Sequence, residues 1–528
     1  MTQDVSVNAT ARAAAAKAVD TLKFTATALI EYQSHGRVLI IGPHETATAA
    51  LACLAENLNG TILQTDYAED PDHVTIPLAE RNIAISGHLG AFVITLGEKG
   101  SLTFETLSAD MILDLCAIPL LDMPIKPPGY LASGNDFFSI EVNASELADM
   151  TGSFDKPRYF EYDSQICAHS RSGQPGCSRC LDSCPTGAIQ SLGEMIEVDP
   201  YLCQGGGVCA TVCPTGAIRY VYPDLKDQLT RLRLLIHTYL DHHGEKPCVI
   251  FISEAEAEQF ELVADNVLLM PVEELASVGL ETWLSALAYG ANQVVLAGAS
   301  VPETVSGWLD QQIDIAWAIL STFDIPEQAI RRIPDVSRHN APGIEWQPAN
   351  RASYAGLNDK RNMLYAAIDA LANGQRNKIT ELPEGAPLGR IHVDGDLCTL
   401  CMACTSVCPS HAIVAGGEKP ALLFHEVNCV QCGICEQACP ESAITLQPRL
   451  NLDIDERRRG IVVNEQKPFN CVVCGKPFAT RNIIDTMLGK LADHPMFQSE
   501  RAKKRLMMCD DCRVVDVVQD DDMMNPTR

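Results

Sequence analysis

Two stretches of the chain alternate short apolar runs with segments whose apolar residues recur at helical spacing. In residues 1–130, the alanine-rich segment Ala11–Ile30 predicts a helix, and the apolar run Arg37–Gly42 predicts a buried strand. The same pattern predicts a helix over Thr46–Leu58 ended by Gly60, and strands over Thr61–Leu63, Ala91–Leu96 and Leu102–Leu107. This stretch is therefore expected to form an α/β domain, followed by an irregular linker over Pro124–Tyr130.

The second such stretch covers residues 225–345. Leucines and a tyrosine recur there at helical spacing and indicate one buried helix face: Leu225, Leu229, Leu232, Leu235 and Tyr239. Strands are expected over Val249–Ile252, Val267–Met270 and Gln293–Ala297, and helices over Glu254–Phe260, Glu281–Tyr289 and Thr304–Phe323. This alternation predicts a small parallel sheet. A proline-containing linker over 334–350 and a helical linker over 351–380, whose face carries Leu357, Leu364, Ile368 and Leu371, follow it.

Cysteine usage changes this picture. The chain has 528 residues and 22 cysteines, and all but Cys53, Cys116 and Cys248 fall into groups with metal-ligand spacing. Such groups indicate metal ligands rather than a disulfide framework. The three scattered cysteines are expected to be small buried hydrophobic residues.

The most regular group lies in residues 388–448. It reads Cys398-x2-Cys401-x2-Cys404-x3-Cys408-Pro and then Cys429-x2-Cys432-x2-Cys435-x3-Cys439-Pro. This double run resembles the bacterial 2(4Fe–4S) ferredoxins, in which the fourth cysteine of each run binds the other cluster. The resemblance assigns Cys398, Cys401, Cys404 and Cys439 to cluster A, and Cys429, Cys432, Cys435 and Cys408 to cluster B. Zinc or disulfides are the less favoured alternatives.

A second, modified unit occupies residues 155–222. Its halves carry Cys167, Cys177, Cys180 and Cys184, and then Cys203, Cys209 and Cys213. Each half ends in Pro-Thr-Gly-Ala-Ile, and the later unit repeats Ala-Ile at the same offset, so one half-ferredoxin occurs four times. By the family's crossing rule, Cys167, Cys177, Cys180 and Cys213 would bind cluster C.

Cluster D is then left with three cysteines, Cys184, Cys203 and Cys209, because Gly206 stands where the fourth is expected. Three thiolates suit a 3Fe–4S centre or a 4Fe–4S cluster with one open iron. Alternatively, Cys116 or Cys53 supplies a distant ligand, or this cluster has been lost. The loop between Cys167 and Cys177 also holds His169, which is more often solvated than a ligand in such a place.

The last 74 residues, 455–528, contain Cys471-x2-Cys474 and Cys509-x2-Cys512. Two such pairs predict a closed site of four thiolates, and the glycine after Cys474 is typical of a zinc knuckle. Structural zinc is therefore favoured over a further iron–sulfur cluster.

The formal net charge of −28 argues against nucleic acid as a partner and favours docking on basic faces of redox proteins. The first residues form no secretory signal, and no apolar run is long enough to span a membrane. A cytoplasmic protein is therefore expected.

Two weaker resemblances extend the prediction. The segment from Met270-Pro271 through Trp283 to Ala297 is similar to the delta-subunit module of hydrogenase and heterodisulfide reductase complexes, although Gly298–Val301 lacks that module's cysteines. In order along the chain, Ile125–Tyr130, Cys167–Gly173 and the terminal cysteine pairs resemble multi-cluster ferredoxin-type proteins that bacteria associate with formate dehydrogenases.

These observations predict an α/β and α+β multidomain protein with two bacterial-ferredoxin-like dicluster units, small parallel-sheet α/β modules and a C-terminal zinc-knuckle-like domain. Its expected cofactors are three or four 4Fe–4S clusters, with a 3Fe–4S centre as the alternative at cluster D, and one zinc. The expected function is relay of single electrons as partner or subunit of a soluble dehydrogenase of the formate dehydrogenase kind. The alternatives are a redox enzyme that uses an open-site cluster or a flavin, and a redox-sensing or assembly scaffold. No catalytic residue is predicted.

Overall fold

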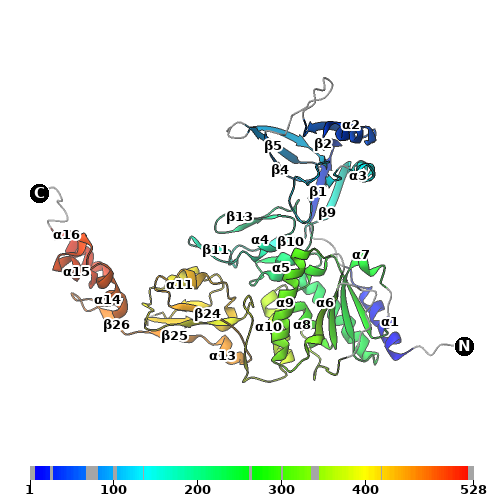
Figure 1. Ribbon diagram of the computed structural model, residues 1–528. Helices are drawn as coiled ribbons and strands as arrows, with labels where there is room; N and C mark the ends of the chain where they lie inside the picture. Colours follow the sequence, from blue (N-terminus) through cyan, green and yellow to red (C-terminus); the bar gives the residue numbers. More distant parts are fainter. Residues whose placement is uncertain are drawn as a thin grey trace.

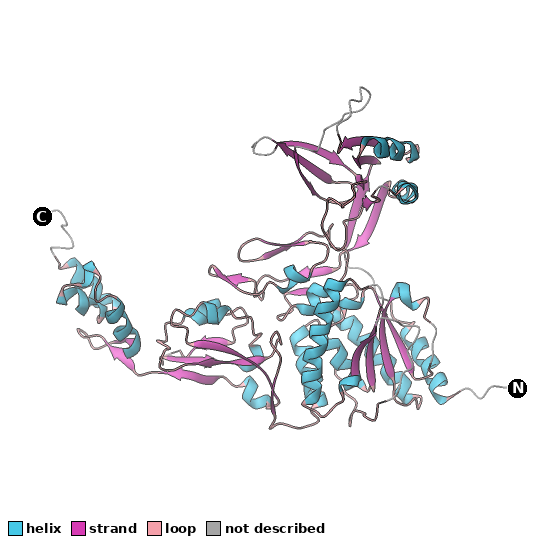
Figure 2. Ribbon diagram, viewed as in Figure 1, coloured by secondary structure: helices cyan, strands magenta, loops and turns pink. Residues whose placement is uncertain are grey.

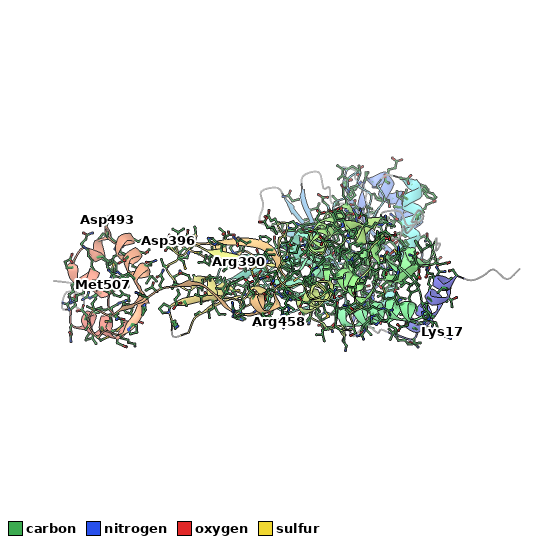
Figure 3. The ribbon with its side chains drawn as sticks, turned by 90° about the horizontal axis from the view of Figure 1, so that it is seen from below. Lys17, Arg390, Asp396, Arg458, Asp493 and Met507 are labelled. Atoms are coloured by element: carbon green, nitrogen blue, oxygen red, sulfur yellow. The ribbon has the colours of Figure 1, made fainter. Side chains whose placement is uncertain are left out.

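The computed structural model describes residues 6–23, 28–66, 81–98, 104–134, 136–260, 264–298, 301–333, 344–417 and 419–520 (Figure 1). Figure 1 shows a row of modules, with the N-terminal sheets at the top, a second α/β module at the right and the C-terminal domain at the far left. One cysteine-rich unit lies below the N-terminal sheets, around α4, and the other lies around α11 and β24. The view from below in Figure 3 shows the chain elongated from the C-terminal domain to the second α/β module, and Figure 1 shows the N-terminal sheets projecting away from this line.

The N-terminal module is built around a parallel sheet of order β3-β2-β7-β8 (Asn59–Gln64, Arg37–Gly42, Met111–Asp114 and Tyr130–Ala132). Residues 38–42 of β2 are all buried, as expected of a central parallel strand with both faces covered. Helices α2 (His44–Cys53) and α3 (Phe137–Asp149) pack with this sheet. An antiparallel sheet of β4 (Arg81–Ser86), β5 (Phe92–Glu98) and β6 (Phe104–Ala109) completes the module, and β1 (Leu29–Ser34) pairs with β9 (Gly152–Pro157).

Two sequence-based predictions in this module are wrong. The helix predicted over Ala11–Ile30 is α1 (Val7–Val19), and Leu29 and Ile30 instead begin strand β1. Helix α2 ends at Cys53, and Gly60 lies inside β3 rather than ending a helix. An added Cβ at Gly60 would lie 2.2 Å from a methyl carbon of Leu51, so this glycine allows α2 to pack closely on the sheet. The predicted strand Leu102–Leu107 lies partly outside the described residues.

The second α/β module has the predicted parallel sheet, with order β17-β16-β18-β19 (Val267–Val272, Cys248–Ser253, Gln293–Ala297 and Ile330–Ile333). Figure 2 shows helices on both sides of these strands. They include α6 (Leu225–Asp241), α7 (Glu254–Ala257), α8 (Leu280–Tyr289) and α9 (Glu303–Ser321). The predicted face of α6 is largely confirmed, because Leu229, Leu232, Leu235 and Tyr239 are all buried.

This module draws helices from outside its own stretch of sequence. Helix α1 packs against α6, so residues 7–19 belong by packing to this module and not to the N-terminal sheets. Helix α10 (Lys360–Leu371), expected in a linker, packs against α8 and buries Met363, Leu364 and Ile368 in the same core. Leu357 precedes α10 and is half exposed, so it is not part of the buried helix face.

The first cysteine-rich unit has short elements. Strand β10 (Phe160–Tyr162) pairs with β15 (Ile218–Tyr220), and two hairpins are formed by β11 (Ser170–Arg171) with β12 (Gln174–Pro175) and by β13 (Ile189–Ser191) with β14 (Ile196–Val198). Helices α4 (Arg179–Ser183) and α5 (Val208–Val212) lie against each other.

The second unit repeats this plan with additional strands. Its sheets are β20-β24-β21 (Ile379–Glu381, Ile444–Asn451 and Gly389–Val393) and β22-β23-β25 (Ile413–Ala415, Ala421–Phe424 and Ile461–Glu465). The short helices are α11 (Ala403–Val407), α12 (Ile434–Gln437) and α13 (Ile454–Arg458). Strand β20 pairs with β24, and strand β25 pairs with β23. These two strands extend the unit on both sides of residues 388–448.

The C-terminal domain contains the hairpin β26–β27 (Pro468–Asn470 and Pro477–Thr480) and helices α14 (Arg481–Lys490), α15 (Glu500–Leu506) and α16 (Asp510–Val518). Among the described helices, none has the length and apolar character that crossing a bilayer requires.

A buried arginine joins the second unit to the α/β module. Arg457 on α13 is 1% exposed and donates to both carboxylate oxygens of Asp369 on α10, at 2.5 Å, and to the carbonyl of Asn451 at 3.2 Å. Its guanidinium carbon lies 4.6 Å from the ring centroid of Tyr365, also on α10. The arginine is therefore held by an ion pair, by hydrogen bonds and by a cation–π contact.

We predict that Arg457→Ala lowers the free energy of unfolding by about 3 kcal/mol, because it leaves a partly buried carboxylate without its partner. Chemical denaturation followed by circular dichroism would measure the change. The matched control is Arg458→Ala, at the next, exposed position, which should change the free energy by less than about 0.5 kcal/mol. Equal effects of the two substitutions would contradict this role of Arg457.

Candidate metal centres

The cysteines of the two units gather around four separate cavities. One is lined by Cys398, Cys401, Cys404 and Cys439, and a second by Cys408, Cys429, Cys432 and Cys435. A third is lined by Cys167, Cys177, Cys180 and Cys213, and the fourth by Cys184, Cys203 and Cys209. These are the groups expected for clusters A, B, C and D, in which one cysteine of each half crosses to the other group. The structure thus brings the residues together; that they bind clusters remains a prediction.

The loops that carry the cysteines use an unusual backbone conformation. Leu400 and Met402 between the ligands of cluster A, and Gln431 and Gly433 in cluster B, all have positive φ. Non-glycine residues rarely adopt this conformation, and it is typical of functional sites where the surroundings hold it in place. Here it allows the thiols of three cysteines, with two residues between one cysteine and the next, to point toward one centre.

The loop of cluster D keeps this conformation without its second cysteine. Gly205 and Gly207 have positive φ at the positions that Gln431 and Gly433 occupy in cluster B, and Gly206 corresponds to Cys432. The backbone therefore still forms a ligand loop, and only the thiol is absent at Gly206.

Hydrogen bonds to sulfur also fit iron–sulfur ligands. The backbone N–H groups of Ala412 and Ala443 donate to Sγ of Cys408 and Cys439, at 3.2 and 3.3 Å. The side-chain amide of Gln431 donates to Sγ of Cys429 at 3.1 Å. Such bonds stabilise thiolates and tune the reduction potential of a cluster.

The burial of the thiols affects their protonation. Burial and the neighbouring cysteines raise the pKa of Cys404 and of Cys432 to about 12. At neutral pH these thiols would stay protonated by themselves, whereas a bound metal deprotonates its cysteine ligands. The donor sets therefore fit iron–sulfur clusters.

The cysteine groups expected for clusters B and C meet at the boundary between the two units. Cys177 and Cys432 pack against the same small apolar group, which consists of Ala168, Val407 and Ile434. An added Cβ at Gly176 would lie 2.6 Å from a side-chain carbon of Ile434, so the two units meet closely at this glycine. One cysteine from each of these two groups therefore contacts the same apolar residues.

The insertion between Cys167 and Cys177 forms this contact. It folds into the β11–β12 hairpin, and β12 lies against α12 of the second unit. His169 within it uses both ring nitrogens, one at 3.0 Å from the carbonyl of Cys177 and one at 2.7 Å from Oγ of Ser191. This histidine thus orients the hairpin and does not line cluster D.

Two basic residues at the start of α10 link the units, and sequence reasoning missed both. Lys360 donates to the carbonyls of Ala210 and Thr211 in the first unit, at 2.7 and 2.5 Å. Arg361 donates to the carbonyls of Val427 and Cys429 in the second unit, at 2.6 and 2.5 Å. The sequence did hold a signal for them, because two consecutive cations in the first turn of a helix are unfavourable next to the positive end of the helix dipole. Their presence there therefore indicates that they bind something outside the helix.

The two candidate distant ligands do not lie among the residues that line the cavity at cluster D. Neither Cys53 nor Cys116 lines its cavity, and Cys116 instead packs among the apolar residues between the N-terminal sheets. Burial and the nearby Asp114 carboxylate raise the pKa of Cys116 to about 12. Lys156 supports the Cys203 loop by donating to the carbonyl of Cys203 at 2.6 Å, and burial lowers its pKa to about 8.

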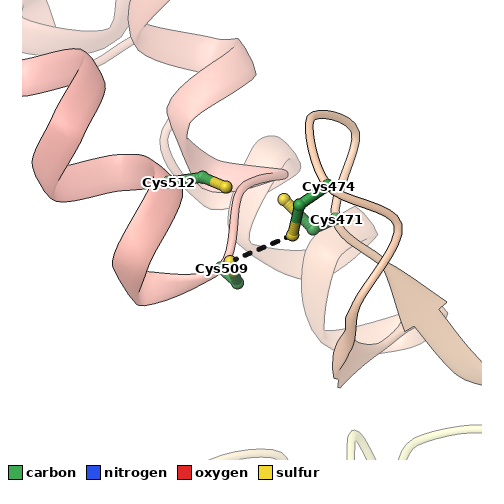
Figure 4. A group of neighbouring side chains, drawn as sticks. All are labelled: Cys471, Cys474, Cys509 and Cys512. Carbon is green, nitrogen blue, oxygen red and sulfur yellow. Dashed lines mark hydrogen bonds between the residues drawn. The ribbon is translucent and has the colours of Figure 1, made fainter.

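The four C-terminal cysteines also come together. Their sulfur atoms all lie within 4.8 Å of one another, with Cys471 and Cys474 on the hairpin turn and Cys509 and Cys512 at the start of α16 (Figure 4). Sγ of Cys474 lies 3.6 Å from Sγ of Cys509, and Gly475 has the positive φ that closes the turn. This geometry suits one tetrahedrally bound ion; the identity of the metal remains a prediction.

Comparison with known proteins supports the reading of both units. Family models described as 4Fe–4S dicluster domains match residues 397–444 and residues 146–217. Ferredoxin-1 of Caulobacter vibrioides is 32% identical over 98 residues, which cover 18% of this chain and 83% of that protein. An uncharacterized ferredoxin of Methanocaldococcus jannaschii is 30% identical over 60 residues, which cover 11% of this chain and 95% of that protein. With two such domains in one polypeptide, the chain belongs to the 4Fe–4S dicluster ferredoxins.

Proposed function

We propose that this protein relays single electrons along a row of four iron–sulfur clusters, which lie in the spatial order D, C, B, A. The observation that carries this order is the packing of Cys177 and Cys432 against one apolar group at the boundary between the units. When bound, each cluster exchanges one electron, and the protein sets its potential through hydrogen bonds, charge and burial. Clusters A, B and C are 4Fe–4S clusters in this proposal, and D is a 3Fe–4S centre with three thiolate ligands.

The positions of the two ends support a relay rather than a shuttle with one cluster pair. Cluster D lies against the second α/β module, whose residues Glu273 and Ala276 line the same cavity. Cluster A lies toward the C-terminal domain, and its ligand Cys401 and the neighbouring Leu397 are exposed. A redox partner can therefore approach cluster A directly, on the side of the molecule marked by Asp396 in Figure 3.

The partner in this proposal is a soluble dehydrogenase of the formate dehydrogenase kind in the cytoplasm. The support is the net charge of −28, which favours docking on a basic face of the partner. The C-terminal site holds zinc and stabilises its domain, which touches the second unit through few bonds, such as that from Thr480 Oγ1 to the carbonyl of Thr399.

Metal content tests the set of centres. Anaerobically reconstituted protein should contain about 15 iron atoms per chain and one zinc. Cys474→Ser should remove the zinc and leave the iron unchanged, whereas Cys432→Ser should lower iron alone. Elemental and labile-sulfide analysis would measure both. A preparation that reaches only about eight irons would exclude two dicluster units, and extra iron in place of zinc would reassign the C-terminal site.

Magnetic coupling between reduced clusters tests the order. Because clusters B and C are neighbours, paramagnetic resonance of the fully reduced protein should show the signal of C broadened by B. Cys432→Ser should remove that broadening, and the matched substitution Cys401→Ser, in cluster A, should leave it in place. If the signal of C is unaffected by Cys432→Ser but changes in Cys401→Ser, the order is wrong.

Salt dependence tests the docking mode. The rate at which a partner dehydrogenase reduces the clusters should fall as salt rises, because screening limits attraction to roughly 8 Å at physiological ionic strength. Asp396→Asn, beside cluster A, should slow reduction at low salt, while Asp20→Asn, exposed at the far end near α1, should not. Photochemical reduction by a neutral deazaflavin is the control for the clusters themselves. A rate independent of salt, or equal effects of both substitutions, would exclude this docking.

A further inference from the structure

The cavity at cluster D is much larger than the other three. It measures about 400 Å³, whereas the cavities at clusters A, B and C measure about 20 Å³ each. The three small cavities show how little space beyond the thiols a cluster site leaves open in this protein. The cavity at cluster D therefore extends well past the position of a cluster, into the size range of small-molecule sites.

The extra space lies at the carboxyl edge of the parallel sheet in the second α/β module. Ser253 ends β16, Glu273 and Glu274 follow β17, and Val301 follows β18 and leads toward α9; all four residues line the cavity. Strand β16 lies between β17 and β18. The chain therefore passes from β16 to β17 on one side of it and later forms β18 on its other side. Small molecules bind at this switch point in open α/β sheets.

Cluster D presents its open corner to this space. Gly206 lines the cavity, and an added Cβ there would meet no atom within 4 Å among the described residues. The neighbouring Gly207 is close-packed instead, with an added Cβ only 2.4 Å from Cα of Ser277. The loop is therefore firmly seated on the α/β module, while the position of the missing thiol stays accessible from the cavity.

The walls of the cavity restrict the charge of a ligand. Glu256, Glu273 and Glu274 line it, and none of its described lining residues is lysine, arginine or histidine. Glu273 accepts a hydrogen bond from the hydroxyl of Tyr159 at 3.4 Å. Burial, and then the other nearby glutamates, raise the pKa of Glu274. Anions would be repelled here, whereas a group with N–H or O–H donors would find acceptors.

A buried phenol, that of Tyr220, lies near these glutamates but outside the lining of this cavity. Tyr220 is 7% exposed, and its hydroxyl has no hydrogen-bond partner among the described residues. Burial and then the charges of Glu273, Tyr159 and Glu274 raise its pKa, which places it beside the same glutamates. The cavity wall also has an apolar part, which includes Ile125, Val208, Leu275 and Val305, and the polar side chains of Thr186, Gln204 and Ser253.

We propose that this cavity binds a small molecule that has hydrogen-bond donors and no negative charge, at the open corner of cluster D. The glutamates hold the donor end, and the apolar wall contacts the body of the molecule. The proposal rests on the proposed function in one respect, namely that Cys184, Cys203 and Cys209 hold a cluster. It makes cluster D a binding site at one end of the relay.

Imidazole is the probe, and formate and acetate are the anionic controls of similar size. In anaerobic wild-type protein, imidazole should change the paramagnetic resonance signal of cluster D in a saturable way and leave those of A, B and C unchanged. Formate and acetate should have no effect. An imidazole effect on all clusters, no effect on D, or an equal effect of the anions would overturn the proposal.

Three variants locate the site. Glu274→Gln should weaken the imidazole effect several-fold, and Glu258→Gln, an exposed glutamate outside the cavity, is the matched control. Val301→Trp should fill the cavity and abolish the effect while the signal of D without imidazole persists. Gly206→Cys should supply the fourth thiolate and make D insensitive to imidazole.

Calorimetry separates failure of this proposal from failure of the proposed function. Imidazole should bind wild-type protein measurably and bind Val301→Trp at least several-fold more weakly, whichever cluster is present. If cluster D has no signal but this difference in binding persists, the cluster assignment fails and the cavity remains a binding site. If the signal is present and the two proteins bind imidazole equally, the cavity proposal fails.

Discussion

Two neighbouring cations at the start of α10 hold the ferredoxin units at a defined separation. The ammonium of Lys360 binds carbonyls at the end of α5, between Cys209 and Cys213, where the helix dipole favours a positive charge. The guanidinium of Arg361 binds the carbonyl of Cys429. Hydrogen bonds from charged donors contribute about 1.5–3 kcal/mol each. Because both residues contact backbone that carries cluster ligands, the helix transmits a fixed geometry to both units.

That constraint gives the second α/β module a mechanical role. Helix α10 is seated in the module's core through Met363, Leu364 and Ile368, and Arg457 ties α13 of the second unit to the same helix. A dense core transmits position well, since close-packed interiors deform little. The module thus serves as a frame that holds the two cysteine-rich units together, and the hairpin inserted between Cys167 and Cys177 lies at their boundary.

The first unit differs from the second where it meets this frame. Its Cys203 loop keeps the positive φ at Gly205 and Gly207 but carries no thiol at Gly206, and the cavity opens there toward Glu273 and Glu274. In the second unit, the matching loop with Cys432 faces the other unit and encloses little space. One repeated loop therefore occupies two different surroundings, one closed against the other unit and one open to a large cavity.

The sequence by itself determined the cysteine groups, the strands around Val249–Ile252 and the buried face of α6. These follow from spacing within a few residues, which local backbone geometry and side-chain burial translate directly into structure. It also indicated Gly206 as the position where a cysteine is missing, because the matching position in the later unit is Cys432. It did not place Leu29 and Ile30 in a strand, since their partner β9 lies more than a hundred residues away.

Only the tertiary structure decided where these parts lie. Helix α1 packs on α6, α10 enters the same core, and Cys177 and Cys432 pack against one apolar group, although these parts are distant in sequence. Such contacts depend on which apolar faces meet and which carbonyls remain for Lys360 and Arg361, and no local pattern encodes that choice. The cavity at cluster D is of the same kind, because it arises between a loop and a sheet edge that are separate in the sequence and become neighbours only in the folded chain.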